Sequence, residues 1–136
     1  MLLEYRVDQL QRVLAQLCHT LEGARAAVVV SIEGLVVASY PPEDGAFLDE
    51  GMAHSSQVAA MASIMVSLAE RTLTRLGLSD GTAERLLIEG PRGSIIVLPV
   101  NPEVALAVVL EKEAKPGIVF HVIPRAAQQI QQILRQ

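Results

Sequence analysis

The sequence predicts an α+β fold in which helices cover both faces of a β-sheet. Three segments with a helical spacing of apolar residues are separated by two, and then by three, short runs rich in β-branched residues. The first two runs, "AAVVVSI" and "LVVASY", lack the alternation of a half-exposed strand, which is typical of strands buried on both faces. Turn-forming Gly, Pro and Asn residues lie between the later runs.

The length and composition predict one domain, residues 1–136, that associates with itself. Hydrophobic residues make up 51% of the chain, aromatic residues make up 3%, and Trp is absent. We therefore expect a core of Leu, Val, Ile and Ala. Because a chain of this size cannot hide so much apolar surface alone, the composition favours self-association.

Charge and cysteine content exclude several classes of function. The net charge is −4 and no basic stripe is present, so we expect no nucleic-acid partner. No run of 18 apolar residues occurs, so we expect no membrane insertion. The single Cys18 fits a reducing compartment, and Glu4 and Asp8 interrupt any signal-peptide pattern. These features predict a cytoplasmic location.

Residues 2–22 are predicted to form the first helix, and residues 25–40 the first hairpin. Gly23 ends the helix, the hairpin turn lies near Glu33-Gly34, and Pro41-Pro42 ends the second strand. The apolar face of the helix comprises Leu3, Val7, Leu10, Leu14, Leu17 and Leu21.

Residues 48–76 are predicted to form a long helix, with Asp44 or Asp49 as its cap and Gly77 as its stop. Its apolar arc spans ~200°, whereas an ordinary surface helix needs ~100°. A helix buried on most sides within one chain would explain this arc. Self-association explains it better, because the two other helices must cover the sheet.

The segment 83–110 is predicted to hold three strands, "AERLLIEG", "SIIVLPV" and "VALAVVLE". Glu84, Arg85 and Glu89 place charges on the first of them, which is typical of a sheet edge. An edge strand can pair with a copy of itself across a two-fold axis. Pro99 should lie at a bulge or near a strand end.

Residues 115–136 hold the last helix, for which the sequence allows two starting points. The helix begins near Pro116-Gly117 and kinks at Pro124, or it begins at Pro124. An unbroken apolar rhythm favours the kinked helix. The residues that keep this rhythm are Val119, Ile123, Ala126, Ile130 and Ile133.

Motifs for catalysis are missing from the sequence. There is no P-loop, no dinucleotide-binding glycine pattern, and no metal-ligand spacing among His19, His54 and His121. The "HSS" at 54–56 lacks the surroundings of a serine nucleophile, and Cys18 has no partner base nearby. We therefore predict no catalytic residue, no metal, no cofactor and no enzymatic activity.

The chain resembles the roadblock family, which is related to dynein light chains. The resemblance rests on the hairpin "GARAAVVVSIEGLVVASY", the small-residue helix "AHSSQVAAMASIMVSLAERTLTRLGL", and the strands "AERLLIEGPRGSIIVLPVNPEVALAVVLE". It covers nearly the whole chain and implies one roadblock-like domain. Pro99 and Pro124 depart from the family pattern.

This resemblance implies a five-stranded antiparallel sheet, with the long helix on one face and the first and last helices on the other. It also implies a homodimer, in which the long helices pack together and the third strands pair into one continuous sheet. The implied dimer residues are Val58, Met61, Met65, Leu68, Arg85 and Leu87.

Roadblock proteins resemble regulators of Ras-like small GTPases, and bacterial and archaeal members resemble the MglB type. The resemblance therefore implies a GTPase partner that binds a helical surface of the dimer. Arg71 and Arg75 are candidates for an arginine finger or are solvated surface residues. The predicted partner-binding strip comprises Ser56, Gln57, Ser63, Ser67, Arg71 and Arg75.

Two alternatives to a GTPase regulator stay open at this point. A passive dimeric scaffold would bind a GTPase without preferring one nucleotide state. A small-molecule sensor would need a pocket with convergent polar groups.

Overall fold

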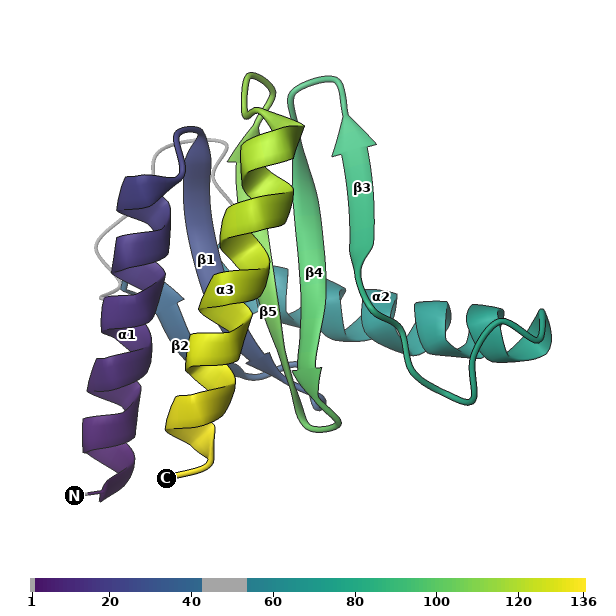
Figure 1. Cartoon of the computed structure of the whole chain (residues 1–136), viewed down its shortest axis with the longest axis horizontal. Coiled ribbons are helices and arrows are strands. Elements are labelled where there is room, and N and C mark those ends of the chain that lie inside the picture. The colour runs from purple at the N-terminus through teal and green to yellow at the C-terminus, as the bar shows by residue number, and fades with distance from the viewer. Residues whose placement is uncertain (1, 43–53) are drawn as a thin grey trace.

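The computed structural model describes residues 2–42 and 54–136, which form three helices and five strands. The order is helix, two strands, helix, three strands, helix, which confirms the predicted order (Figure 1). The elements are α1 (Leu2–Thr20), β1 (Ala24–Ser31), β2 (Val36–Tyr40), α2 (Ser55–Arg75), β3 (Leu86–Gly90), β4 (Gly93–Asn101), β5 (Val104–Glu111) and α3 (Pro116–Leu134).

The five strands form one antiparallel sheet with the order β2-β1-β5-β4-β3. α1 and α3 lie side by side on one face, and α2 crosses the other face (Figure 1). This arrangement confirms the predicted fold class. The strands at the two edges of the sheet are β2 and β3.

Each face of the sheet has its own core, because successive strand side chains point to opposite faces. Val29, Leu106 and Val108 face α1 and α3 in the larger core, and Val28, Val30 and Ala107 face α2 in the smaller one. All six side chains are almost completely buried. The non-alternating strands are therefore covered on both faces, as the sequence predicted.

Both prolines that depart from the roadblock pattern are accommodated locally. The pairing of β4 with β5 shifts between Pro99 and Asn101, so Pro99 lies at the predicted irregularity. α3 runs from Pro116 to Leu134 with Pro124 inside it, which confirms the predicted start near Pro116-Gly117 and not at Pro124. Within residues 2–42 and 54–136, no helix has the length and apolar character needed to cross a membrane.

Two predicted boundaries are wrong. α2 begins at Ser55 and not at 48: His54 precedes it in an extended conformation, and the His54 backbone N–H donates to Gln57 Oε1 at 3.2 Å. The predicted caps Asp44 and Asp49 lie outside the described residues. β3 begins at Leu86 and not at 83, because the preceding residues belong to the loop that follows α2.

The β1–β2 turn packs directly against α2, and a glycine makes this contact feasible. Gly34 has a φ of +85°, and a Cβ atom there would lie 2.9 Å from Ser63 Oγ. The turn is also tied to the β4–β5 turn, since the Ile32 backbone N–H donates to Glu103 O at 2.9 Å. One end of the sheet is therefore fixed against α2.

We expect Gly34→Ala to lower the free energy of unfolding by about 1–2 kcal/mol, because alanine in a left-handed conformation is strained and its methyl group would press on Ser63. Urea unfolding measures the change. Gly117→Ala is the matched control: Gly117 lies inside α3 and has open space around it, so this variant should keep or gain stability. Equal stability of the two variants would contradict the packing described here.

Candidate protein-interaction site

α2 is longer than the sheet surface that it covers. Its buried residues are Val58, Ala59 and Ala62, which all lie in the first half of the helix. The second half runs past β3 and projects from the body of the molecule (Figure 1). The projecting end is nonetheless well formed, since the Leu78 N–H bonds to Leu73 O at 2.8 Å and the Gly77 N–H bonds to Thr74 O at 3.1 Å, a Schellman motif.

Three large apolar side chains of α2 are exposed and form what we call the α2 stripe. Met61 is 55% exposed, Ile64 is 57% exposed and Leu68 is 56% exposed. Their spacing of three and four residues places them on one side of the helix. Met65 lies between this stripe and the sheet, and packs against the smaller core. A stripe of this kind needs a partner surface that the described residues do not provide.

The edge strand β3 adds apolar surface beside α2. Ile88 is 52% exposed and Leu87 is 42% exposed. The pairing of Leu86 with Val97 puts Leu86, and hence Ile88, on the face that carries α2. Leu87 points to the opposite face and lines a shallow hollow with Phe120 of α3. The strand therefore offers apolar side chains on both faces and an unpaired backbone edge.

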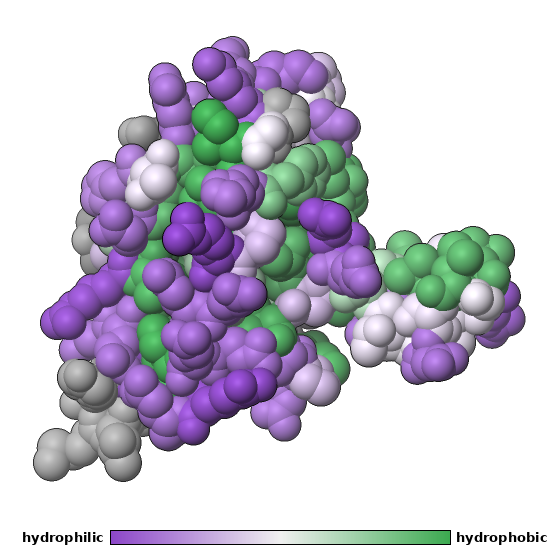
Figure 2. All heavy atoms as spheres, in the orientation of Figure 1, coloured by the Kyte–Doolittle hydropathy of each residue, from purple (hydrophilic) through white to green (hydrophobic). Residues whose placement is uncertain are grey.

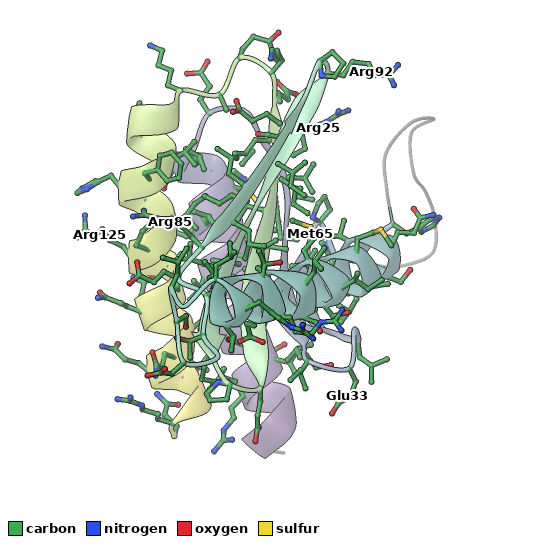
Figure 3. All side chains as sticks on the ribbon, turned by 90° about the vertical axis from the view of Figure 1, so that its right-hand side faces the viewer. Arg25, Glu33, Met65, Arg85, Arg92 and Arg125 are labelled. Atoms are coloured by element: carbon green, nitrogen blue, oxygen red, sulfur yellow. The ribbon has the colours of Figure 1, made fainter. Side chains whose placement is uncertain are left out.

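The structure divides the predicted dimer residues into three groups. Met61 and Leu68 lie on the α2 stripe, with Met65 beside it. Val58 is 5% exposed and belongs to the smaller core, so its surface is already covered. Leu87 and Arg85 lie on the side of α3: Leu87 lines the hollow with Phe120, and Arg85, just before β3, lies over the Phe120 ring, 5.5 Å from its centroid (Figure 3).

Two apolar residues of this surface are missing from the predicted set. Ile64 could have been found from the helical wheel, because it falls between Met61 and Leu68. Ile88 could not have been found from the sequence, because the sheet face on which its side chain lies depends on a pairing register that the sequence leaves open.

The projecting end of α2 carries apolar residues of its own. Leu76 is 67% exposed and Leu78 is 69% exposed. Figure 2 shows apolar side chains gathered over this end. One side of the overhang is therefore apolar at its end, and its other side, with Glu70, Arg71 and Thr74, is polar.

The predicted partner-binding strip does not form one continuous surface. Ser63 and Ser67 line a groove between α2 and the β4–β5 turn. Arg71 and Arg75 line a neighbouring hollow at the overhang, together with Gly81 of the following loop, and Glu70 lines both the hollow and the groove. Ser56 is exposed near the start of the helix. Gln57, through its Oε1, caps the same end.

The described residues show no constellation suited to catalysis. Within them, no group of three or more His, Cys, Asp or Glu side chains could hold a metal ion. His19 contacts Tyr40, with 3.4 Å between Nε2 and the hydroxyl oxygen, and His54 lies at the start of α2. Burial raises the pKa of the Cys18 thiol to about 11, so the reactive thiolate is disfavoured.

An exposed helix stripe beside an open sheet edge is typical of a protein-interaction domain. A family model described as "Roadblock/LC7 domain" matches residues 10–110. The chain therefore belongs to the Roadblock/LC7 family, as the resemblance predicted.

Known proteins similar to this chain agree with that assignment. "Uncharacterized protein MJ1340" of Methanocaldococcus jannaschii is 34% identical over 121 residues, which is 89% of this chain and 96% of that protein. The crystal structure of a Roadblock/LC7 domain from Streptomyces avermitilis superposes with a TM-score of 0.79 at 21% identity, over 93% of this chain and 98% of the other. Myxococcus xanthus MglB gives a TM-score of 0.78 at 16% identity, over 95% and 90%. The two structures establish similarity of fold.

We expect Cys18 to react slowly with iodoacetamide at neutral pH, and much faster once the chain is unfolded in denaturant. The pKa of the thiol in the folded state, about 11, lies above the ordinary cysteine pKa of about 8.5. Between these values the folded state keeps a proton that the unfolded state loses, so the free energy of unfolding should fall as pH rises through this window. Mass spectrometry follows the alkylation. Equal rates in folded and unfolded protein would contradict the burial.

Proposed function

We propose that the chain acts as a homodimer assembled through the α2 stripe and the β3 edge. The observation that carries this proposal is the exposed α2 stripe, Met61, Ile64 and Leu68, on a helix that runs past its own sheet. In a two-fold arrangement, the overhang of each protomer would lie against the partner. Pairing of the two β3 edges would at the same time satisfy their unpaired backbone groups.

The homodimer is proposed to regulate a Ras-like small GTPase without any enzymatic activity of its own. Membership of the Roadblock/LC7 family supports this proposal, because the roadblock resemblance implies GTPase regulation.

Regulation by this dimer would depend on a difference in affinity between nucleotide states. A surface that binds the GTP state better than the GDP state shifts the switch segments of the GTPase toward the favoured state. Equal affinity for both states would shift nothing. Hydrolysis accelerates if the bound state orients the water and the catalytic groups of the GTPase itself.

Arg71 and Arg75 are proposed to act on the GTPase. They lie three and seven residues after Leu68, on the side of α2 that carries the α2 stripe, so a GTPase would reach them only where the partner protomer leaves the overhang uncovered. Both are exposed on the projecting half of α2, where they line one hollow. Within the described residues, no ion pair holds either guanidinium group in place. A bound GTPase could therefore recruit either of them toward developing phosphate charge.

We expect Leu68→Glu to raise the dissociation constant of the homodimer about tenfold or more, because it removes apolar contact and places a carboxylate in the interface. A tenfold change corresponds to about 1.4 kcal/mol of binding free energy. Sedimentation velocity over a range of concentrations measures it. Ile118→Glu on α3 introduces the same charge at a residue that is 49% exposed and lies off the proposed interface. A homodimer that is unaffected by Leu68→Glu would remove the α2 stripe from the interface.

The regulator is tested by capturing GTPases on immobilised protein, once with GDP and once with a non-hydrolysable GTP analogue. We expect a Ras-sized GTPase to be retained in one condition only. Hydrolysis by that GTPase should then slow with Arg71→Ala or Arg75→Ala relative to wild type. Arg125→Ala is the control, because Arg125 lies on α3, away from α2 (Figure 3). Retention in both conditions would indicate a passive scaffold and contradict the proposal.

A further inference from the structure

A second surface of α2 lines a groove that the proposed homodimer does not use. Ser63, Val66 and Glu70 form one wall, and Pro102 and Glu103 of the β4–β5 turn belong to the opposite wall. The α2 stripe, with Met61 and Leu68, lies on the other side of the helix, because two residues of separation turn an α-helix by about 200°.

The walls of this groove are held together by hydrogen bonds and close packing. The Ile32 N–H donates to Glu103 O at 2.9 Å, and the Glu103 N–H donates to Asn101 Oδ1 at 2.8 Å. Gly34 lets the β1–β2 turn approach Ser63 of α2. Three segments that are distant in sequence are thereby fixed against one another. A preformed groove of this kind lowers the entropic cost of binding.

The charged residues that line the groove are all acidic. Glu70 lies on α2 and Glu103 on the facing turn. Glu33 adds a third carboxylate in the adjoining β1–β2 turn (Figure 3). Within residues 2–42 and 54–136, no ion pair joins these carboxylates to a basic side chain. The lining of the groove itself therefore carries only negative charge, which favours a cation. Arg71 and Arg75 lie in the neighbouring hollow that Glu70 also lines.

The groove also has apolar walls and an apolar rim. Val66, Pro102 and Val104 contribute to its lining. Ile32 is 61% exposed and Leu35 is 65% exposed, and both belong to the β1–β2 turn at its edge. A ligand that matches this surface must combine a positive charge with apolar groups.

We propose that this groove binds a Lys or Arg side chain of a partner protein, in a segment that also carries apolar residues. The aliphatic stem of such a side chain would pack along the apolar walls while its charged end reaches Glu70 or Glu103. The apolar residues of the segment would cover Ile32 and Leu35. A purely apolar segment would instead desolvate the carboxylates without pairing them, and an acidic segment would be repelled.

This inference goes beyond the proposed function and does not depend on nucleotide state. The test uses the purified chain without a GTPase, so its failure would leave the proposed function standing. Isotope-labelled protein is titrated with the capped peptide Leu-Arg-Leu and followed by NMR. We expect saturable shifts of the Ile32, Ser63, Ser67 and Glu103 amides, but not of the Met61 amide.

A control peptide and a small cation separate the contribution of the positive charge from that of the peptide chain. Leu-citrulline-Leu keeps the shape of the arginine side chain but lacks its charge, and it should bind about tenfold more weakly. Equal affinity for both peptides would overturn the role of the carboxylates. Ethylguanidinium alone should bind much more weakly than the peptide. Equal affinity for that small cation would overturn the assignment to a protein segment.

Variants test the carboxylates directly. Glu70→Gln combined with Glu103→Gln keeps the shape of both side chains, and should weaken binding of the arginine peptide about tenfold. Glu89→Gln in β3 makes the same kind of change away from the groove, and should leave the affinity unchanged. Undiminished binding of the arginine peptide to the double variant, with the thermal unfolding of that variant unchanged, would overturn the proposal. NMR shifts that are absent, or that fall outside the groove, would overturn it as well.

Discussion

α2 is longer than the sheet surface beneath it, and this difference in length leaves part of the helix uncovered by its own chain. Only small or β-branched residues in the first half of the helix, namely Val58, Ala59 and Ala62, are buried against the sheet. The larger apolar side chains Met61, Ile64 and Leu68 lie on another side of the helix and have no surface of their own chain to cover them. The larger core, shared by α1 and α3, holds the sheet rigid and so fixes the direction in which α2 projects.

This arrangement separates two sides of the same helix. One side carries the α2 stripe next to the unpaired edge of β3, and the other carries Ser63, Ser67 and Glu70 beside the turns of the sheet. A homodimer formed through the first side would leave the second side facing solvent. The proposed regulator could then hold its own assembly constant while it binds a partner elsewhere on α2.

Local patterns in the sequence were enough to predict most of the fold, and the family resemblance supplied the sheet and its layers. Element order, the two-sided burial of β1 and the continuous α3 all follow from apolar spacing and turn residues. The start of β3 and the sheet face that Leu87 occupies could not be predicted from these patterns, because both depend on pairing with β4. Likewise, Arg85 resembles a strand charge in sequence, but Phe120, 35 residues later in the chain, determines where it lies.

The central claim is that a second copy of the chain completes the open edge of the sheet. Native-state hydrogen exchange tests this most directly, at the β3 amides between Leu86 and Gly90 that do not bond to β4. We expect these amides to be protected as strongly as those of an interior strand, because each N–H would donate a hydrogen bond to β3 of the partner protomer across the two-fold axis. Exchange at the rate of an exposed edge, at concentrations where the protein is fully folded, would contradict it.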